Sequence, residues 1–105
     1  MVQLPPPLEQ IRPRLEMEFG ARLRGVLLFG SRARGDHRAD SDVDLMVLLA
    51  APFSLAEDHH RVVHALYPMQ LETDLLMHAL PVDASDYESQ RLEIFRTVRR
   101  EGVPL

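Results

Sequence analysis

Two aspartates separated by a single valine are the side chains in this sequence best suited to metal chemistry. Asp42 and Asp44 stand at the start of an apolar run that continues to Ala51. Because side chains alternate along a strand, both carboxylates are expected on one face, close enough to hold one hard divalent cation. A core would not tolerate two unpaired carboxylates, so we expect the pair near the mouth of a sheet. The alternative is that both are solvated, the usual fate of acidic side chains.

A second group of residues, just upstream, is suited to binding phosphate. Gly30 and Ser31 follow an apolar run that ends at Phe29, where a short helix is expected to begin. A helix start offers free backbone N–H groups, glycine lets a phosphate approach the backbone, and serine adds a hydroxyl donor. Arg32 and Arg34 add guanidinium donors suited to phosphate oxygens. The alternatives are that Ser31 only caps the helix and that the arginines are structural or solvated.

Together these two groups predict a transfer reaction. A phosphate cradle beside a pair of carboxylates is what phosphoryl or nucleotidyl transfer from a metal-bound nucleoside triphosphate requires.

Other candidate clusters are weaker. His60 and His64 have the i, i+4 spacing of two zinc ligands, but no third ligand is evident, and a solvated pair is the better interpretation. His59 falls within the apolar arc of the helix expected to begin after Ser54, so we expect it to be partly buried.

The last cluster is a set of arginines near the C-terminus: Arg91, Arg96, Arg99 and Arg100. They could form a basic strip for a partner or RNA, but we favour the alternative that they complement a helix dipole.

The elements that must position these residues follow from the apolar spacing and the turn-forming residues. They predict an α/β or α+β domain with helices packed on a small sheet. The expected elements are a helix over 8–19 kinked at Pro13, a strand over 25–29, a helical turn and loop over 32–41, a strand over 42–51, a helix from the N-cap Ser54 to just before Pro68, a strand over 70–80 ended by Pro81, and a helix over 85–101 with Ser85 and Glu88 as a capping box.

Composition narrows the class of protein. The chain has 105 residues, 46% of them hydrophobic and 27% charged, which is typical of one folded, water-soluble domain. All 12 basic residues are arginine and the net charge is −4, which argues against bulk binding of nucleic acid. No apolar run is long enough to span a membrane, and residues 5–7 are prolines where a signal peptide would need an apolar helix. The absence of cysteine fits a reducing compartment, so we expect a cytoplasmic protein.

The two chemical groups also carry a family resemblance. Gly30-Ser31, ten residues, then Asp42-Val43-Asp44 resembles the active-site signature of the nucleotidyltransferase superfamily that includes DNA polymerase β. The stretch over 30–49 is similar to the small minimal nucleotidyltransferase branch of that superfamily. The order of elements and the ending over 100–103, Arg-Glu-Gly-Val, also look like that branch.

The resemblance implies a polymerase β-like fold with a small mixed sheet flanked by helices, a core over about 24–80, and two magnesium ions. The reaction would be in-line attack on the α-phosphate of a nucleotide, ATP in this branch, with pyrophosphate leaving. By position, Gly30 and Ser31 would hold the triphosphate, and Asp42 and Asp44 would bind the metals.

The family also has a third metal-binding carboxylate, on a later strand beside the first two. The resemblance implies that Asp74 is the matching residue, which would complete the metal site and help to deprotonate the acceptor. Glu72 shares the expected strand face and is the alternative.

The branch finally implies a partner. Its MntA-type antitoxins act beside small helical HEPN-domain toxins, and where activity is known they transfer AMP from ATP to a tyrosine of the toxin. The resemblance thus implies a protein adenylyltransferase in a type VII toxin–antitoxin system, with a HEPN toxin as hetero-oligomeric partner. Two alternatives stay open: a vestigial site in an antitoxin that acts by contact, or an acceptor that is an RNA end or an aminoglycoside.

Overall fold

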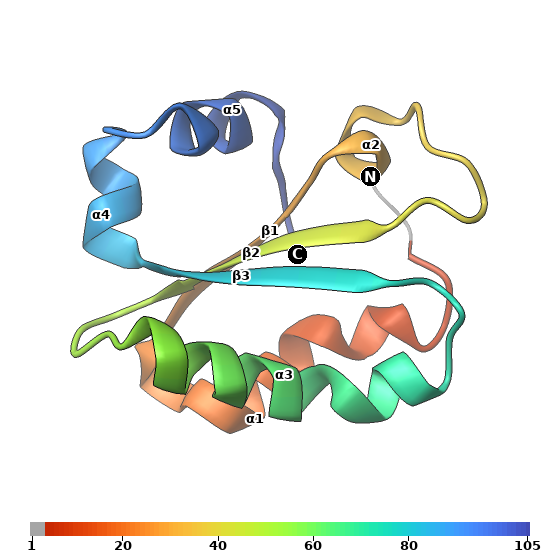
Figure 1. The fold of residues 1–105 in the computed structure, drawn as a ribbon, viewed down its shortest axis with the longest axis horizontal. Coiled ribbons are helices and arrows are strands. Elements are labelled where there is room, and N and C mark those ends of the chain that lie inside the picture. The colour runs from red at the N-terminus through yellow and green to blue at the C-terminus, as the bar shows by residue number, and fades with distance from the viewer. Residues whose placement is uncertain (1–3) are drawn as a thin grey trace.

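A four-stranded sheet with helices on both faces organises residues 4–105, the part of the chain that the computed structural model describes (Figure 1). The elements in chain order are the 3-10 turn η1 (Leu8–Gln10), α1 (Ile11–Phe19), the 3-10 turn η2 (Gly20–Arg22), β1 (Leu23–Phe29), α2 (Ser31–Arg34), β2 (Val43–Leu49), α3 (Leu55–Leu71), β3 (Met77–Asp83), α4 (Ala84–Ser89), α5 (Glu93–Glu101) and β4 (Val103–Pro104).

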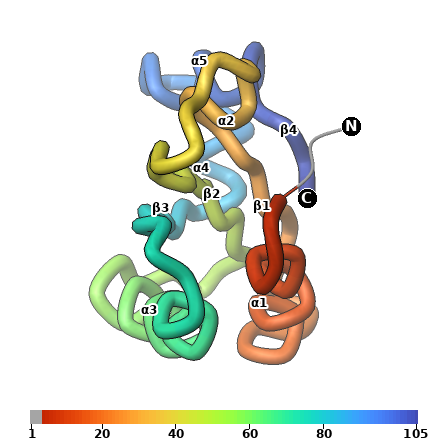
Figure 2. Tube along the Cα trace, turned by 90° about the vertical axis from the view of Figure 1, so that its right-hand side faces the viewer, coloured from red at the N-terminus to blue at the C-terminus, as the bar shows by residue number. Residues whose placement is uncertain are grey.

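The sheet is mixed, with strand order β3-β2-β1-β4. β1 pairs antiparallel with β2 and β4, whereas β2 pairs parallel with β3. A parallel pair needs a long crossover, which α3 supplies. Helices α1 and α3 lie side by side on one face, and α4 and α5 cover part of the other (Figures 1 and 2). The expected fold class, helices on a small mixed sheet, is confirmed.

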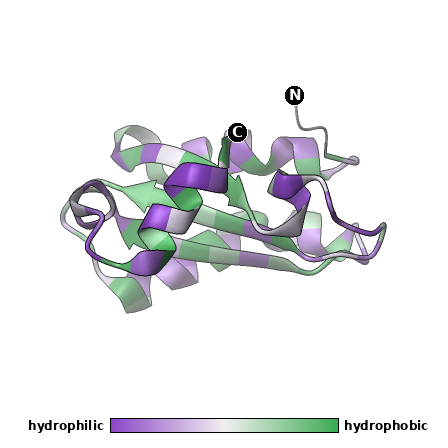
Figure 3. Ribbon diagram, turned by 90° about the horizontal axis from the view of Figure 1, so that it is seen from above, coloured by the Kyte–Doolittle hydropathy of each residue, from purple (hydrophilic) through white to green (hydrophobic). Residues whose placement is uncertain are grey.

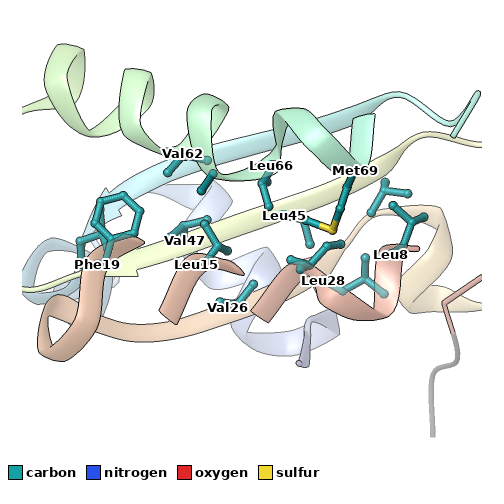
Figure 4. Packing of buried hydrophobic residues seen from close by; sticks show 14 residues of the cluster. Leu8, Leu15, Phe19, Val26, Leu28, Leu45, Val47, Val62, Leu66 and Met69 are labelled. Atoms are coloured by element: carbon teal, nitrogen blue, oxygen red, sulfur yellow. The ribbon is translucent and has the colours of Figure 1, made fainter. Parts of the chain in front are cut away.

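Alternation along β2 divides the apolar side chains between the two faces. Val43, Leu45 and Val47 pack against α1 and α3, while Met46 and Leu48 pack under α4 and α5. Figure 4 shows the first cluster, in which Leu15 and Phe19 of α1 and Val62, Leu66 and Met69 of α3 meet the strands. Seen from above, the strands are mostly hydrophobic and the polar residues concentrate in helices and loops (Figure 3).

Two prolines do not end the elements that they were expected to end. Helix α3 continues through Pro68 to Leu71. Pro68 and His64, whose carbonyl loses its helical partner, are both exposed, so water can solvate that carbonyl. Met69, 2% exposed, anchors the last turn in the core. Pro81 lies inside β3, which is an edge strand and therefore tolerates a residue without an N–H.

The C-terminal segment also differs from the expected single helix. Gln90 has a φ of 55° and separates α4 from α5. The N-cap of α4 is Asp83, whose carboxylate accepts from the Ser85 N–H at 2.9 Å, so the expected capping box of Ser85 and Glu88 is wrong. The short strand β4, which the pattern did not predict, follows α5.

A buried ion pair fixes the connection between β2 and α3. Both guanidinium Nη atoms of Arg22 donate to Asp58, at 3.0 and 2.9 Å, and Arg22 also donates to the carbonyls of Ala50 and Pro52. The Asp58 carboxylate accepts from the Ser54 N–H as well, at 3.1 Å. Only 4% of the Asp58 side chain is exposed, so this bidentate pair replaces the solvent that the carboxylate loses.

Among the described residues, no helix is both long enough and apolar enough to cross a membrane.

We predict that Asp58→Asn lowers the free energy of unfolding by roughly 2–3 kcal/mol, because it leaves the guanidinium of Arg22 without its charged partner. Urea unfolding at neutral pH measures this loss. The control is Glu88→Gln, which removes an exposed pair with Arg99 and should cost under about 0.5 kcal/mol. Equal losses in the two variants would contradict the role given to Asp58.

The same pair predicts a pH dependence. Hydrogen bonds from Arg22 hold the pKa of Asp58 below its usual range. The stability advantage of wild type over Asp58→Asn should therefore be complete above the ordinary aspartate pKa and shrink as the pH falls through the lowered one. Repeating the urea titrations from pH 7 downward checks the sign.

Candidate active site

Asp44 lies at the beginning of β2, in the middle of the sheet. It is half-buried, opposite Phe29 of β1 on one side and opposite His78 of β3 on the other. Asp42 stands just before the strand, with 51% of its side chain exposed. Asp44 shares its strand face with Met46, which packs under the C-terminal helices. The acidic pair therefore lies at the mouth of the sheet, next to α2 (Figure 1).

Gly30 connects the acidic pair to the start of α2. Its φ of 74° and ψ of −158° belong to a region of backbone conformation that is essentially restricted to glycine. A Cβ at this position would lie 2.4 Å from Asp44 Oδ2. The expected phosphate cradle and the expected carboxylate pair are thus in direct contact, and the missing side chain of Gly30 is what permits it.

Ser31 opens α2, a single helical turn. Gly30 is the N-cap and has no side chain to occupy the first N–H groups of the turn. The start of α2 and the half-buried Ser31 are therefore next to Asp44. A helix start without a side-chain cap is a place where an anion can bind.

The two arginines of α2 are engaged with the protein itself. Arg32 is 6% exposed and donates to the carbonyls of Ser41 and Ala39, at 3.1 and 3.2 Å, which fixes the loop that leads to Asp42. Arg34 pairs with Asp36 at 3.2 Å and with Glu101 of α5 at 3.5 Å. The hydrogen bond that Arg34 donates to the Asp36 carboxylate raises the pKa of Arg34. These contacts favour the structural alternative for both arginines, and direct contact with phosphate stays a prediction.

Asp74 does not lie on the strand where it was expected. Because α3 runs on to Leu71, β3 begins only at Met77, and Asp74 is exposed in the loop between them. The side chain of Gln70 holds this loop, accepting from the Met77 N–H and donating to the Leu75 carbonyl. The structure brings Gly30, Ser31, Asp42 and Asp44 together and leaves Asp74 outside the group.

His78 occupies the place beside the acidic pair instead. The parallel register puts it directly opposite Asp44, and its Nε2 lies 3.1 Å from Asp42 Oδ2. The expected strand over 70–80 included His78, but only Asp74 and Glu72 were named as candidate site residues on it. The alternation of exposed residues along the segment, with Leu76, His78 and Leu80 on one face, was the available signal.

A cavity of about 320 Å³ adjoins His78. Its other lining residues are Phe29, His59, Met77, Ala79 and Leu80. His59 is exposed at this cavity, so the expectation that it is partly buried is wrong. The core-facing polar residue of this helical turn is its neighbour Asp58.

Most of the C-terminal arginines have intramolecular partners. Arg91 pairs with Asp86, Arg99 pairs with Glu88, and Arg96 donates to the Gln90 carbonyl. These contacts give three of the four arginines structural partners in place of a free basic strip.

The donor chemistry of the site fits a divalent cation only in part. Asp42 and Asp44 offer the carboxylate oxygens that hard cations prefer. The third donor beside them is the imidazole of His78 and not a carboxylate. Within residues 4–105, no three His, Asp or Glu side chains are already gathered closely enough to hold an ion.

Comparisons with known proteins agree with the fold. The profile of the family described as "Polymerase beta, Nucleotidyltransferase" matches residues 9–105. A protein of Methanocaldococcus jannaschii named "Putative protein adenylyltransferase" is 34% identical over 44 residues, which cover 42% of this chain and 44% of that protein. The crystal structure of a "putative nucleotidyltransferase" from Sulfolobus solfataricus superposes with a TM-score of 0.60 at 20% identity, over 91% of this chain and 73% of that one. The chain thus matches under half of the length of the M. jannaschii relative.

We predict that Gly30→Ala disturbs the acidic pair, because the new Cβ must displace the Asp44 carboxylate. The variant should lose binding of a nucleoside triphosphate, measured by calorimetry with a divalent cation present. Gly35→Ala is the matched control, since Gly35 has a φ of 84° but no atom within 4 Å of the added Cβ. Gly35→Ala should cost about 1–2 kcal/mol of stability from backbone strain and Gly30→Ala more, since its conformation is essentially closed to other residues, but only Gly30→Ala should lose binding. Equal binding in the two variants would overturn the assignment.

Proposed function

This chain belongs to the polymerase β nucleotidyltransferase family, and from that premise we propose that it transfers a nucleoside monophosphate, most readily AMP from ATP, to a protein acceptor. The observation that carries the proposal is the contact between Gly30 and Asp44. That contact supports the proposal because the start of α2, which would bind the phosphate, lies directly against the Asp44 carboxylate.

The site residues divide the work of the reaction. The N–H groups at the start of α2 and the Ser31 hydroxyl bind the triphosphate and orient its α-phosphorus towards the acceptor. Asp42 and Asp44 are the residues that would hold the divalent cation. When bound, such a cation neutralises charge on the phosphate oxygens and on the leaving pyrophosphate.

The transfer is a single displacement. An acceptor hydroxyl oxygen forms a bond to the α-phosphorus while the bond from that phosphorus to the oxygen bridging the β-phosphate breaks. Pyrophosphate leaves with the electron pair, and the hydroxyl proton passes to solvent. The products are the adenylylated acceptor, pyrophosphate and a proton.

The acceptor in this proposal is a tyrosine of a HEPN-domain toxin, which makes the chain the antitoxin of the pair. The name of the M. jannaschii relative, a protein adenylyltransferase, supports a protein as acceptor. The resemblance to the minimal nucleotidyltransferase branch supports the toxin.

One observation favours a second candidate, an antitoxin that neutralises the toxin by contact alone. The place beside Asp44 that could supply a third carboxylate holds His78, and Asp74 lies outside the group. A site with a reduced set of carboxylates is compatible with a vestigial enzyme.

We predict that the protein labels its acceptor when incubated with the toxin encoded beside it, a divalent cation and α-labelled ATP. Asp42→Asn and Asp44→Asn should each reduce the labelling rate about 100-fold or more, because each removes a carboxylate that stabilises charge in the transition state. Asp40→Asn, an exposed aspartate of the adjacent loop, is the control and should label as wild type does. Autoradiography and mass spectrometry of the toxin measure the reaction and identify the modified residue.

The double variant Asp42→Asn, Asp44→Asn separates the two candidates. If it fails to neutralise the toxin in growing cells, neutralisation depends on transfer. Neutralisation equal to that of wild type, with no label from any nucleotide, would replace the enzyme with the contact antitoxin.

A further inference from the structure

We propose that the edge of the sheet formed by β3 is the docking surface for the acceptor protein, which covers it with apolar side chains and not with an added strand. This β3-edge surface consists of Val63 and Tyr67 of α3, Leu80 of β3, and Leu92 and Ile94 at the start of α5. The inference rests on the proposed function because it concerns the partner that brings the acceptor hydroxyl to the site.

Exposed apolar side chains are concentrated along this edge. Among residues 4–105, nine large apolar side chains are exposed, and the β3-edge surface contains five of them, from 38% exposed at Ile94 to 56% at Tyr67. Figure 1 looks onto this edge, with β3 between α3 below and α4 and α5 above. Such a concentration of exposed apolar side chains is typical of an interaction surface.

Three hollows form a continuous trough along β3. The first, of about 90 Å³, lies between α3 and β3. The second is the cavity of about 320 Å³ beside His78, and the third, of about 690 Å³, is bounded by β3, α4 and the start of α5. The first and second hollows share Met77 and Ala79 in their linings, and the second and third share Leu80. A partner that fills the two outer hollows therefore also covers the cavity beside His78.

The trough offers few free charges. The charged side chains in its lining are Asp83, Asp86 and Arg91. Arg91 pairs with Asp86, and the Asp83 carboxylate caps α4, so all three are engaged within the chain. A nucleic acid would require free cationic groups, whereas a protein that presents apolar side chains requires none. The chemistry of the trough therefore favours an apolar protein surface as its occupant.

The backbone of β3 is poorly suited to the addition of another strand. The Leu76 carbonyl accepts a hydrogen bond from β2, so by alternation the backbone groups of Met77, Ala79 and Pro81 face away from β2. The side chain of Gln70 accepts from the outward N–H of Met77 at 3.0 Å, and Pro81 has no N–H. An added strand would therefore lack two of these three donors, whereas docking through side chains needs none of them.

The position of the trough relative to Asp44 favours the acceptor as the partner. Asp44 lies between Phe29 of β1, which leads into α2, and His78 of β3, which lines the trough. In the proposed reaction the triphosphate binds at the start of α2, on the β1 side of Asp44. In-line displacement requires the attacking oxygen to lie opposite the leaving pyrophosphate. The acceptor hydroxyl therefore approaches from the β3 side, where a partner on the β3-edge surface would hold it.

The experiment measures, by calorimetry without nucleotide, how tightly this chain binds the toxin encoded beside it. Tyr67→Glu and Ile94→Glu, from the two sides of the trough, should each weaken binding about 10-fold or more, because each sets a charge against apolar side chains. Met17→Glu is the matched control, since Met17 is 82% exposed on α1, on the other side of α3 (Figure 2). It should bind the toxin as wild type does.

Two further measurements exclude indirect effects. Thermal unfolding verifies that the three variants fold, and all three should bind ATP with a divalent cation as wild type does. Photocross-linking tests the surface without adding a charge: a benzophenone amino acid at Val63 should cross-link to the toxin, and the same amino acid at Met17 should not. Mass spectrometry of the cross-linked product identifies the partner.

Three results would overturn the inference. They are equal toxin binding in Tyr67→Glu, Ile94→Glu and Met17→Glu, no toxin binding by wild type, and cross-links from Val63 only to a second copy of this chain. The proposed function fails in a different way, by the absence of label from wild type with any nucleotide, and lost binding in the two edge variants would then still support the docking surface. Labelling with an unchanged KM for the toxin in those variants would keep the enzyme and reject the docking surface.

Discussion

The contact between Gly30 and the Asp44 carboxylate is the constraint on which the rest of the site depends. Antiparallel pairing sets Phe29 opposite Asp44, so the next residue of the chain must pass directly over that carboxylate. Only a residue without a Cβ fits, and its positive φ turns the chain into α2. The same contact therefore sets the start of α2 beside the Asp44 carboxylate and fixes the distance between them.

Two arginines, Arg22 and Arg32, stabilise the loops around this contact. In a chain without lysine, two planar guanidinium groups hold the loops that flank β2. Arg32 binds carbonyls of the loop that delivers Asp42 to the strand, and Arg22 binds Asp58 together with carbonyls at the strand's other end. Each side chain makes several directed hydrogen bonds, which a single ammonium point charge would match less well. Arg32, which was predicted to contact phosphate, thus braces the loop before the strand that carries Asp44.

The paired strands β2 and β3 carry both a residue of the family motif, Asp44, and a residue outside it, His78. Membership in the polymerase β nucleotidyltransferase family accounts for the cradle and the two aspartates. The neighbouring strand β3 places His78, a residue outside the two-aspartate motif, opposite Asp44. The adjoining cavity is lined by Phe29, His78 and Leu80 among others.

The amino-acid sequence by itself determined the fold class and the adjacency of Gly30, Ser31, Asp42 and Asp44, because strand alternation and a glycine before a helical turn are local features. The ends that it predicted at two prolines were wrong. Burial of Met69 extends α3 past Pro68, and the edge position of β3 allows the strand to include Pro81. Those shifts moved β3 by several residues, placed Asp74 in a loop and brought His78 beside Asp44. Only tertiary structure could decide this, because the register between β2 and β3 depends on packing between segments separated by the whole of α3.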